Sequence, residues 1–580
     1  MRKHLLLACA LLAPGPAFAQ SSADAQLRSL YDAEWRWRQA EFGRLEEDEN
    51  WTASADHLPR VDPANQQRRL GYWQTALAAL NRIPVAQLSQ PERINAAVFR
   101  TTLEAMVAEQ RFRLWEMPFN ADSNFWSDIA ARRPFAKAAE YDRYLGRMRD
   151  VPRYFDEQIA NMRAGLARGL SVPRATLTGR DTSIEAFAVA DPLKNPFYAP
   201  FEKLPDTVPA AEQERLRAAA RAAIGQQIVP AYAKLLTFFR GEYLPRARTT
   251  LAAEAMPDGK AFYQAQIREY TTTDLTAEQI HAIGLKEVAR IQADMEKTKA
   301  AAGFTGDMAA FIRFLRTDQR FYAKTPDELM GVSAYVAKRV DGELKTTIGF
   351  LPRYRFTIRP VPDAIAPFYT AGRGGLESCM MNTYDLPSRP LYQIPALTLH
   401  ECSPGHSLQA AIAREGPNQP AFRKQTYFSG FGEGWGLYTE WLGTKMGIYR
   451  TPYEEFGRES YEMWRAARLV IDTGVHHMGW SRAQAIDYLA GHTALSQREV
   501  ETEVDRYISW PGQALAYKLG ELTFRRKRAD AERRLGDKFD QRWFHDLVLS
   551  LGSVPLPLLE EQVDRWIDAG GPNTRADTNN

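Results

Sequence analysis

The sequence predicts a mainly α-helical protein with a small β-sheet in its second half. Apolar residues recur at helical spacing through much of residues 26–350, as Leu27, Leu30 and Tyr31 do near the start. Residues 354–358 instead alternate with a period of two and are followed by prolines, which is typical of a strand. The stretch 359–395 is rich in Pro, Gly, Ser and Asn, so we expect a loop with short strands there.

Helices are expected on both sides of this strand. Residues 210–239 are rich in strong helix formers, and Pro230 within them should kink the helix or split it in two. Residues 276–301 begin with Thr-Ala-Glu-Gln, which is a capping-box pattern. Pro, Asp and Gly collect in breaks at 58–64, 171–209 and 241–258. After 395 we expect helices around 464–471, 483–489 and 513–526.

The N-terminus is predicted to be a secretory signal. A basic start at residues 2–4, a short apolar run and the Ala17-Phe18-Ala19 motif predict cleavage after Ala19, and hence a periplasmic or secreted protein. The apolar run is too short to span a bilayer, and no later stretch approaches that length, so we expect no stable membrane insertion. Leu6-Leu7-Ala8-Cys9 faintly resembles a lipoprotein cleavage box, but the apolar run before it is too short for such a signal.

The composition is that of a soluble globular protein, and the charge balance bears on which classes of partner the protein binds. Hydrophobic residues make up 45% and charged residues 25%, and 74 basic against 71 acidic residues leave a net charge of +3. This balance gives no reason to expect binding to nucleic acid. The mature chain keeps Cys379 and Cys402, which either pair or stay buried thiols; both alternatives are open.

A histidine-rich motif at residues 400–406 is the first candidate site. The chain has nine histidines, and two of them, His400 and His406, flank Glu401 and a Pro-Gly pair. Imidazoles bind zinc, and a nearby carboxylate can act as a general base. On an undistorted helix residues six apart point about 240° apart, but a bulge or kink at Pro404-Gly405 could bring the imidazoles together. The alternative is a helix that ends at Pro404, with His406 in the following loop.

A catalytic zinc site needs a third protein ligand, and the segment GFGEGWGLYTE offers two candidates. Glu433 and Glu440 are seven residues apart, so they share a helix face. One could bind metal while the other orients a histidine. The alternative is that both are solvated, but the glycines around Glu433 cost helix stability and favour a close approach there.

Two later segments supply candidates for binding and catalysis. The hydroxyl groups of Tyr507 and Tyr517, or the imidazole of His476, could donate hydrogen bonds to the oxyanion of a tetrahedral intermediate. The alternative is that the tyrosines are core aromatics. The candidates to hold a substrate carboxylate are Arg465, Arg468 and Lys518.

Four blocks of the sequence together resemble the ordered signature of a bacterial family, domain-of-unknown-function family 885, of exported zinc-metallopeptidase-like proteins. The blocks are LTLHECSPGHSLQ, GFGEGWGLYTE, RLVIDTGVHHMGW and RYISWPGQALAYKLGEL, and they lie within about residues 375–525. The family pattern H-E-x-x-P-G-H includes Pro404 and Gly405. The general layout suggests that the family covers nearly the whole mature chain.

The resemblance implies a large, two-lobed helical fold with a deep channel, similar to angiotensin-converting enzyme, thimet oligopeptidase and Taq-type carboxypeptidase. It also implies zinc held by His400, His406 and Glu433, with Glu401 as the base. In those enzymes a second acid lies one helical turn after the ligand glutamate, where this chain has Leu437. We divide the mature chain into an N-terminal helical half, 20–350, and a metal-binding catalytic half, 351–580, within one enzyme unit.

The function expected from the sequence is a periplasmic zinc peptidase that hydrolyses short peptides. Glu401 would take the proton of a zinc-activated water and deliver it to the leaving amine. One alternative is a zinc amidase that acts on cell-wall peptides with the same residues. Another is a non-catalytic binding protein of the same fold, although ligation alone would not need Glu401.

Overall fold

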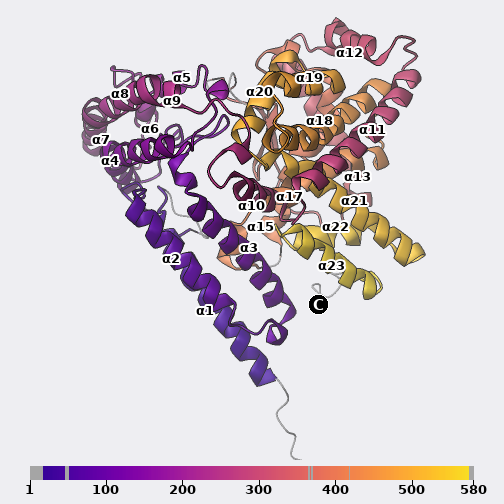
Figure 1. Cartoon of the computed structure of the whole chain (residues 1–580), viewed down its shortest axis with the longest axis horizontal. Helices are drawn as coiled ribbons and strands as arrows, with labels where there is room; N and C mark the ends of the chain where they lie inside the picture. The colour runs from indigo at the N-terminus through magenta and orange to yellow at the C-terminus, as the bar shows by residue number, and fades with distance from the viewer. Residues whose placement is uncertain (1–16, 46–50, 364–365, 367–369, 417, 574–580) are drawn as a thin grey trace, which may run out of the picture.

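The structure is a computed structural model that describes residues 17–45, 51–363, 366, 370–416 and 418–573, and it is mainly α-helical (Figure 1). The helices before the sheet are α1 (Ala17–Glu41), α2 (Pro63–Leu80), α3 (Gln90–Phe112), α4 (Ala138–Arg168), α5 (Thr182–Glu185), α6 (Ala199–Glu202), α7 (Ala210–Ala223), α8 (Val229–Phe238), α9 (Leu244–Arg246), α10 (Gly259–Thr271), α11 (Ala277–Ala301), α12 (Met308–Thr317) and α13 (Pro326–Thr347). Those after it are α14 (Ile394–Glu401), α15 (His406–Glu415), α16 (Ala421–Lys424), α17 (Ser429–Lys445), α18 (Pro452–His476), α19 (Arg482–His492), α20 (Gln497–Ser509), α21 (Ala516–Leu535), α22 (Gln541–Ser550) and α23 (Leu556–Asp568). The predicted mainly α class is therefore confirmed.

The small sheet lies between α13 and α14 in the chain. Its strands are β1 (Thr357–Pro360), β2 (Gly372–Arg373) and β3 (Ser378–Met381), in the order β1-β3-β2. Strand β3 runs parallel to β1, with Cys379 opposite Ile358, and antiparallel to β2, with Met381 opposite Gly372.

The strand expected at 354–358 begins three residues later than predicted. The backbone amides of Arg353 and Tyr354 donate to the carboxylate of Glu415 on α15, at 2.9 and 2.6 Å, instead of to a neighbouring strand. Sheet pairing therefore starts only at Thr357.

The helix boundaries agree with several local predictions. A π-helical turn, Ile224–Ile228, separates α7 from α8, and Pro230 lies in the first turn of α8, where its missing N–H is tolerated. The capping box before α11 is present, with the Thr276 side chain accepting from the Gln279 amide and the Gln279 side chain accepting from the Thr276 amide.

The predicted signal peptide lies almost wholly outside the described residues. Within the described part of the chain, no helix has the length and apolar character needed to cross a bilayer.

Several hydrophobic cores hold the helices together. One core joins α1, α2 and α3, near the start of the chain, to α17, α21 and α23 near its end. A second core lies among α4, α7 and α8, which gather on the left in Figure 1. Helix α17 packs against α14 and α21, and a Cβ on Gly434 would lie 2.5 Å from Cα of Gly520 on α21. This close packing holds α17 against α21.

Candidate metal centre

The motif at 400–406 is divided between two helices. Helix α14 ends at Glu401 and α15 begins at His406, so the chain turns between them at residues 402–405. The Trp435 indole of α17 donates to the Pro404 carbonyl at 2.9 Å, and the Gly405 amide donates to the Leu399 carbonyl at 3.0 Å. A Cβ on Gly405 would lie 1.9 Å from the His400 carbonyl oxygen, so only glycine fits this turn. The expected kink within one helix is therefore a complete break.

This break brings the two imidazoles together, with ring centroids 4.9 Å apart. Glu433, in the first half of α17, faces both: its Oε2 lies 3.5 Å from His400 Nε2 and 3.4 Å from His406 Nε2. Among the described residues, His400, His406 and Glu433 are the one group of His, Cys, Asp and Glu side chains whose ligand atoms lie close enough to share a metal ion, within 4.8 Å of one another.

The spacing of these atoms would suit a tetrahedral metal ion such as zinc. Zinc lies about 2.0–2.1 Å from histidine nitrogen, so neighbouring ligands in a tetrahedral site are roughly 3.4 Å apart. The two nitrogen–oxygen distances, 3.4 and 3.5 Å, match this separation. Two histidines and one carboxylate also form a common ligand set of catalytic zinc, which leaves the fourth position open.

His400 is held from its other side by Glu440. The two groups meet at 2.8 Å, between His400 Nδ1 and Glu440 Oε1, while Arg465 Nη2 lies 3.5 Å from the same oxygen. This bond orients the ring and leaves Nε2 directed at Glu433. A Cβ on Gly436 would lie 2.7–3.0 Å from the atoms of the His400 ring, so glycine at this position lets the imidazole pack on α17. Leu437, one helical turn after Glu433, is buried beside Tyr517.

The electrostatics of the centre favour a positive charge among the ligands. Burial would lower the pKa of His400, but hydrogen bonds with Glu433 and Glu440 outweigh it and raise the pKa to about 10. Burial opposes a raised pKa at His406 too, and the bond with Glu433 again prevails. Conversely, burial would raise the pKa of Glu433, but the two histidines hold it well below its usual range. The pKa directions thus describe an ionised Glu433 carboxylate paired with two imidazoles that gain protons.

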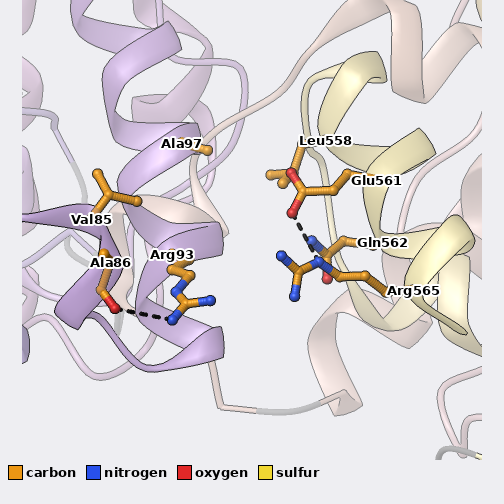
Figure 2. A pocket seen from close by; sticks show the side chains of 8 residues that line it. All are labelled: Val85, Ala86, Arg93, Ala97, Leu558, Glu561, Gln562 and Arg565. Atoms are coloured by element: carbon orange, nitrogen blue, oxygen red, sulfur yellow. Dashed lines mark hydrogen bonds and ion pairs between the residues drawn. The ribbon is translucent and has the colours of Figure 1, made fainter. Parts of the chain in front are cut away.

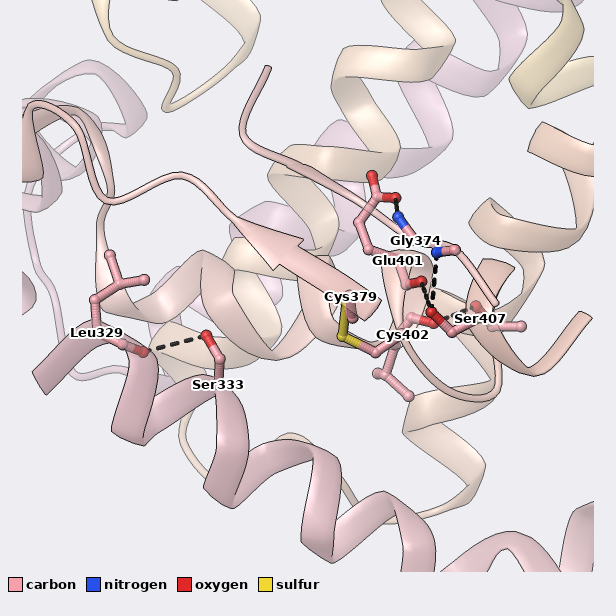
Figure 3. The surroundings of a disulfide bond; sticks show 10 residues. Leu329, Ser333, Gly374, Cys379, Glu401, Cys402 and Ser407 are labelled. Carbon is pink, nitrogen blue, oxygen red and sulfur yellow. Dashed lines mark hydrogen bonds between the residues drawn. A yellow bond between two sulfur atoms is a disulfide. The ribbon is translucent and has the colours of Figure 1, made fainter. Parts of the chain in front are cut away.

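Glu401 lies beside the ligands and is fixed by the sheet. Its Oε2 accepts a hydrogen bond of 2.7 Å from the Gly374 amide, in the loop that follows β2 (Figure 3). The Ser407 hydroxyl donates to the Glu401 carbonyl and accepts from the Gly375 amide, both at 3.2 Å. A Cβ on Gly374 would lie 1.9 Å from the Glu401 carbonyl oxygen, so the loop can approach this closely only with glycine.

A disulfide joins the same two elements. Cys379 of β3 and Cys402, the residue after Glu401, are bonded and fully buried, with Cα atoms 5.3 Å apart (Figure 3). The question that the sequence left open is thus settled in favour of pairing.

Comparison with known proteins places most of the chain in one family. The family model described as bacterial protein of unknown function, DUF885, matches residues 39–563. The chain belongs to this family. No curated protein matches the sequence significantly.

Two solved structures resemble this DUF885 protein along nearly its whole length. A "putative lipoprotein" of Colwellia psychrerythraea is 26% identical, covers 94% of this chain and 99% of its own, and superposes with a TM-score of 0.85. A "putative lipoprotein of unknown function" of Shewanella oneidensis is 17% identical, covers 93% of this chain and 99% of its own, and has a TM-score of 0.70. The second comparison shows the fold alone.

Of the three predicted oxyanion donors, Tyr517 packs against the candidate metal centre of this DUF885 protein. Its ring stacks on His400 with centroids 6.4 Å apart. The hydroxyl of Tyr507 is buried and accepts from Trp464 Nε1 at 2.7 Å and Arg468 Nε at 2.9 Å. The structure therefore places Tyr507 in the core, as the alternative interpretation had it.

His476 is not available as a donor to a substrate. It is fully buried, and its Nδ1 accepts from the Ala253 amide at 3.1 Å while Nε2 lies 2.8 Å from the Tyr507 carbonyl. Burial lowers its pKa to about 3, which keeps the ring neutral. Both ring nitrogens are thus engaged by the backbone.

The three predicted substrate-binding cations are buried in internal contacts. Lys518 is fully buried, with its ammonium group 2.8, 2.9 and 3.2 Å from the carboxylates of Glu462, Glu521 and Glu287. The Arg468 guanidinium lies over the Tyr517 ring at 4.3 Å, and that of Arg465 over the Trp464 ring at 4.2 Å. Arg468 is linked to the site through Tyr517, and Arg465 is linked to it through Glu440. The three carboxylates around Lys518 give this residue a structural role.

Tyr427 was missed by the sequence analysis. Its hydroxyl donates to Glu433 Oε1 at 3.2 Å, although 55% of the residue is exposed. It precedes the glycine-rich block and carries no motif of its own. The one available signal was its position six residues before Glu433, directly upstream of the helix start.

A separate groove of about 510 Å³ lies between the start of α3 and α23 (Figure 2). Its lining includes one carboxylate, Glu561, which is paired with Arg565 at 2.9 Å. None of the candidate catalytic or metal-binding residues lines it. The groove therefore offers no alternative catalytic site.

Proposed function

We propose that this protein is a zinc-dependent peptidase that hydrolyses short peptides in the periplasm. The observation that carries the proposal is the arrangement of His400, His406 and Glu433 at the separations of zinc ligands, with Glu401 next to them. Zinc bound there would supply a Lewis acid for the scissile carbonyl and lower the pKa of its bound water.

The surrounding residues suit the steps of peptide hydrolysis. Glu401 accepts the proton of the attacking water and later gives it to the leaving amine. The Gly374 amide keeps the Glu401 carboxylate in place through the bond at Oε2. Tyr517, whose ring lies near His400 and whose hydroxyl accepts from Arg506 at 3.4 Å, would donate a hydrogen bond to the developing oxyanion.

The finer features of the fold belong to the same proposal. We expect two lobes with a deep channel that leads to the metal centre and favours flexible peptides over folded proteins. Partial exposure of His406 and Glu433, at 17% and 18% of their side chains, supports access from solvent. The description of the Colwellia relative as a putative lipoprotein supports an exported chain.

The first prediction tests the metal and the base together. The purified mature protein should hold about one zinc per chain, as three protein ligands and a water would do. Glu401→Gln should keep the zinc and the fold but lower turnover by roughly 10²–10⁴-fold, because it removes general acid–base catalysis. Elemental analysis and a digest of a peptide library measure both quantities.

A matched variant and a second substrate panel complete this experiment. Glu104→Gln makes the same change at an exposed position on α3 and should leave turnover unaltered. Absence of bound transition metal after zinc is offered, or full turnover in zinc-loaded Glu401→Gln, would refute the proposal. Cleavage of muropeptides but not of linear oligopeptides would favour the amidase.

A further inference from the structure

Tyr427 has an unusual orientation for an exposed tyrosine. Its ring is open to solvent, but its hydroxyl points into the metal centre and donates to Glu433 Oε1 at 3.2 Å. The ring lies against Gly432 at the start of α17, where a Cβ would be 2.2 Å from the hydroxyl oxygen. Glycine at 432 is therefore what allows the tyrosine to reach Glu433.

The segment that carries Tyr427 is anchored on both sides. The Phe428 amide donates to the Ser553 hydroxyl at 2.8 Å, and the Thr426 hydroxyl donates to the Phe422 carbonyl at 2.8 Å. These bonds fix the backbone before and after the tyrosine. Its hydroxyl is thus presented to Glu433 by an ordered turn.

The two oxygens of Glu433 face different partners. Oε2 is the atom that lies 3.4–3.5 Å from both histidine nitrogens, whereas Oε1 accepts from Tyr427. A carboxylate can bind a metal through one oxygen or through both. A hydrogen bond to Oε1 occupies a lone pair that two-oxygen binding of a metal would need.

We propose that Tyr427 is a positioning residue that holds Glu433 as a one-oxygen ligand. This inference rests on the proposed zinc peptidase. A catalytic zinc needs an open position for water or substrate in addition to its three protein ligands. The second oxygen of Glu433 would compete for that position if Tyr427 did not retain it. The tyrosine therefore acts on the reaction through Glu433.

The test compares Tyr427→Phe with Tyr384→Phe, which removes a hydroxyl from another exposed tyrosine. Crystal structures of the zinc-loaded proteins report the coordination of Glu433, and visible spectra of the cobalt-substituted proteins report the coordination number in solution. Wild type and Tyr384→Phe should show one Glu433 oxygen on the metal. In Tyr427→Phe both oxygens should bind, the cobalt bands should weaken, and turnover should fall roughly 10–100-fold, as is typical for the loss of such a partner.

The outcomes separate this inference from the proposed function. One-oxygen binding and an unchanged cobalt spectrum in Tyr427→Phe would overturn the inference, even if turnover fell, because a direct contact with substrate would then explain the loss. A zinc-bound, active wild type would leave the proposed function standing in that case. Failure of the wild type to bind metal would overturn both.

Discussion

Two glutamates two helical turns apart on α17 contact opposite nitrogens of His400. Glu433 faces Nε2, and Glu440 bonds Nδ1 at 2.8 Å while lying 3.5 Å from Arg465. Glu440 is 1% exposed, so its charge is balanced by these buried partners and not by water. Within the proposed zinc site, Glu433 would bind the metal and Glu440 would orient the imidazole.

This division of roles predicts different losses of zinc affinity. Glu433→Ala removes a ligand and should abolish stable zinc binding. Glu440→Gln keeps an oxygen that can accept from Nδ1 but loses the charge, so zinc affinity should fall by no more than the roughly 10–100-fold typical of such partners. Competition with a chromophoric chelator measures both affinities. Tighter zinc binding in Glu433→Ala than in Glu440→Gln would reverse the assignment.

At the residue scale, the members of the candidate centre could be predicted from the sequence, but the directions of several other side chains could not. The spacing and chemistry of His400, His406 and Glu433 marked them as candidates, and their side chains lie together in the structure. Lys518 and His476 were misassigned, since a sequence does not show that three carboxylates or two backbone groups already surround a side chain. Tyr427 reaches the centre through a turn and a glycine contact that no periodicity reveals.

At the element scale, the sheet holds the turn between α14 and α15 at residues 402–405. Strand β3 is bonded to Cys402 by the disulfide, and the loop after β2 is bonded to Glu401 by its amide. The sequence indicated a strand and a Gly-rich loop before the motif. Their pairing depended on contacts distant in sequence, such as the capture of the Arg353 and Tyr354 amides by Glu415.

Removal of the disulfide should therefore affect both stability and catalysis. The Cys379→Ala/Cys402→Ala protein should lose about 2–4 kcal/mol of unfolding free energy, the usual range for a native disulfide. It should retain zinc, because the cysteines are not ligands, but turnover should fall as the loop that fixes Glu401 loosens. Chemical denaturation, metal analysis and peptide kinetics measure these effects.

Reduction provides the matched control for this variant. Reducing agent should shift the wild type toward the stability of the double variant and leave the double variant unchanged. Equal stability and turnover of the wild type and the double variant would show that the disulfide does not support the turn.

At the scale of the whole molecule, contacts between segments distant in sequence join the N-terminal helices to helices of the second half of the chain. Residues of α1, α2 and α3 share a core with α17, α21 and α23. Helix α10 meets α18 and the turn at Gly512 through Asp472, which accepts from the Tyr263 hydroxyl at 2.6 Å and from the Gly512 amide at 3.1 Å. This junction could not be predicted from the sequence, because the block RLVIDTGVHHMGW contains Asp472 but does not show that a distant tyrosine hydroxyl and a backbone amide meet its carboxyl group.

Asp472 should make the stability of the protein depend on pH. Burial raises its pKa from an ordinary value near 3.8 to about 7, although the bonds from Tyr263 and Gly512 oppose this. Between about pH 4 and pH 7 the unfolded chain has released this proton and the folded chain keeps it, so the contribution of Asp472 to the unfolding free energy falls as pH rises, by up to about 1.4 kcal/mol per pH unit. Asp472→Asn keeps an oxygen that can accept both bonds and removes the titration. Melting temperatures should therefore diverge, with Asp472→Asn gaining on the wild type from pH 5 to pH 8, and parallel curves across this range would show that the carboxyl group does not titrate as predicted.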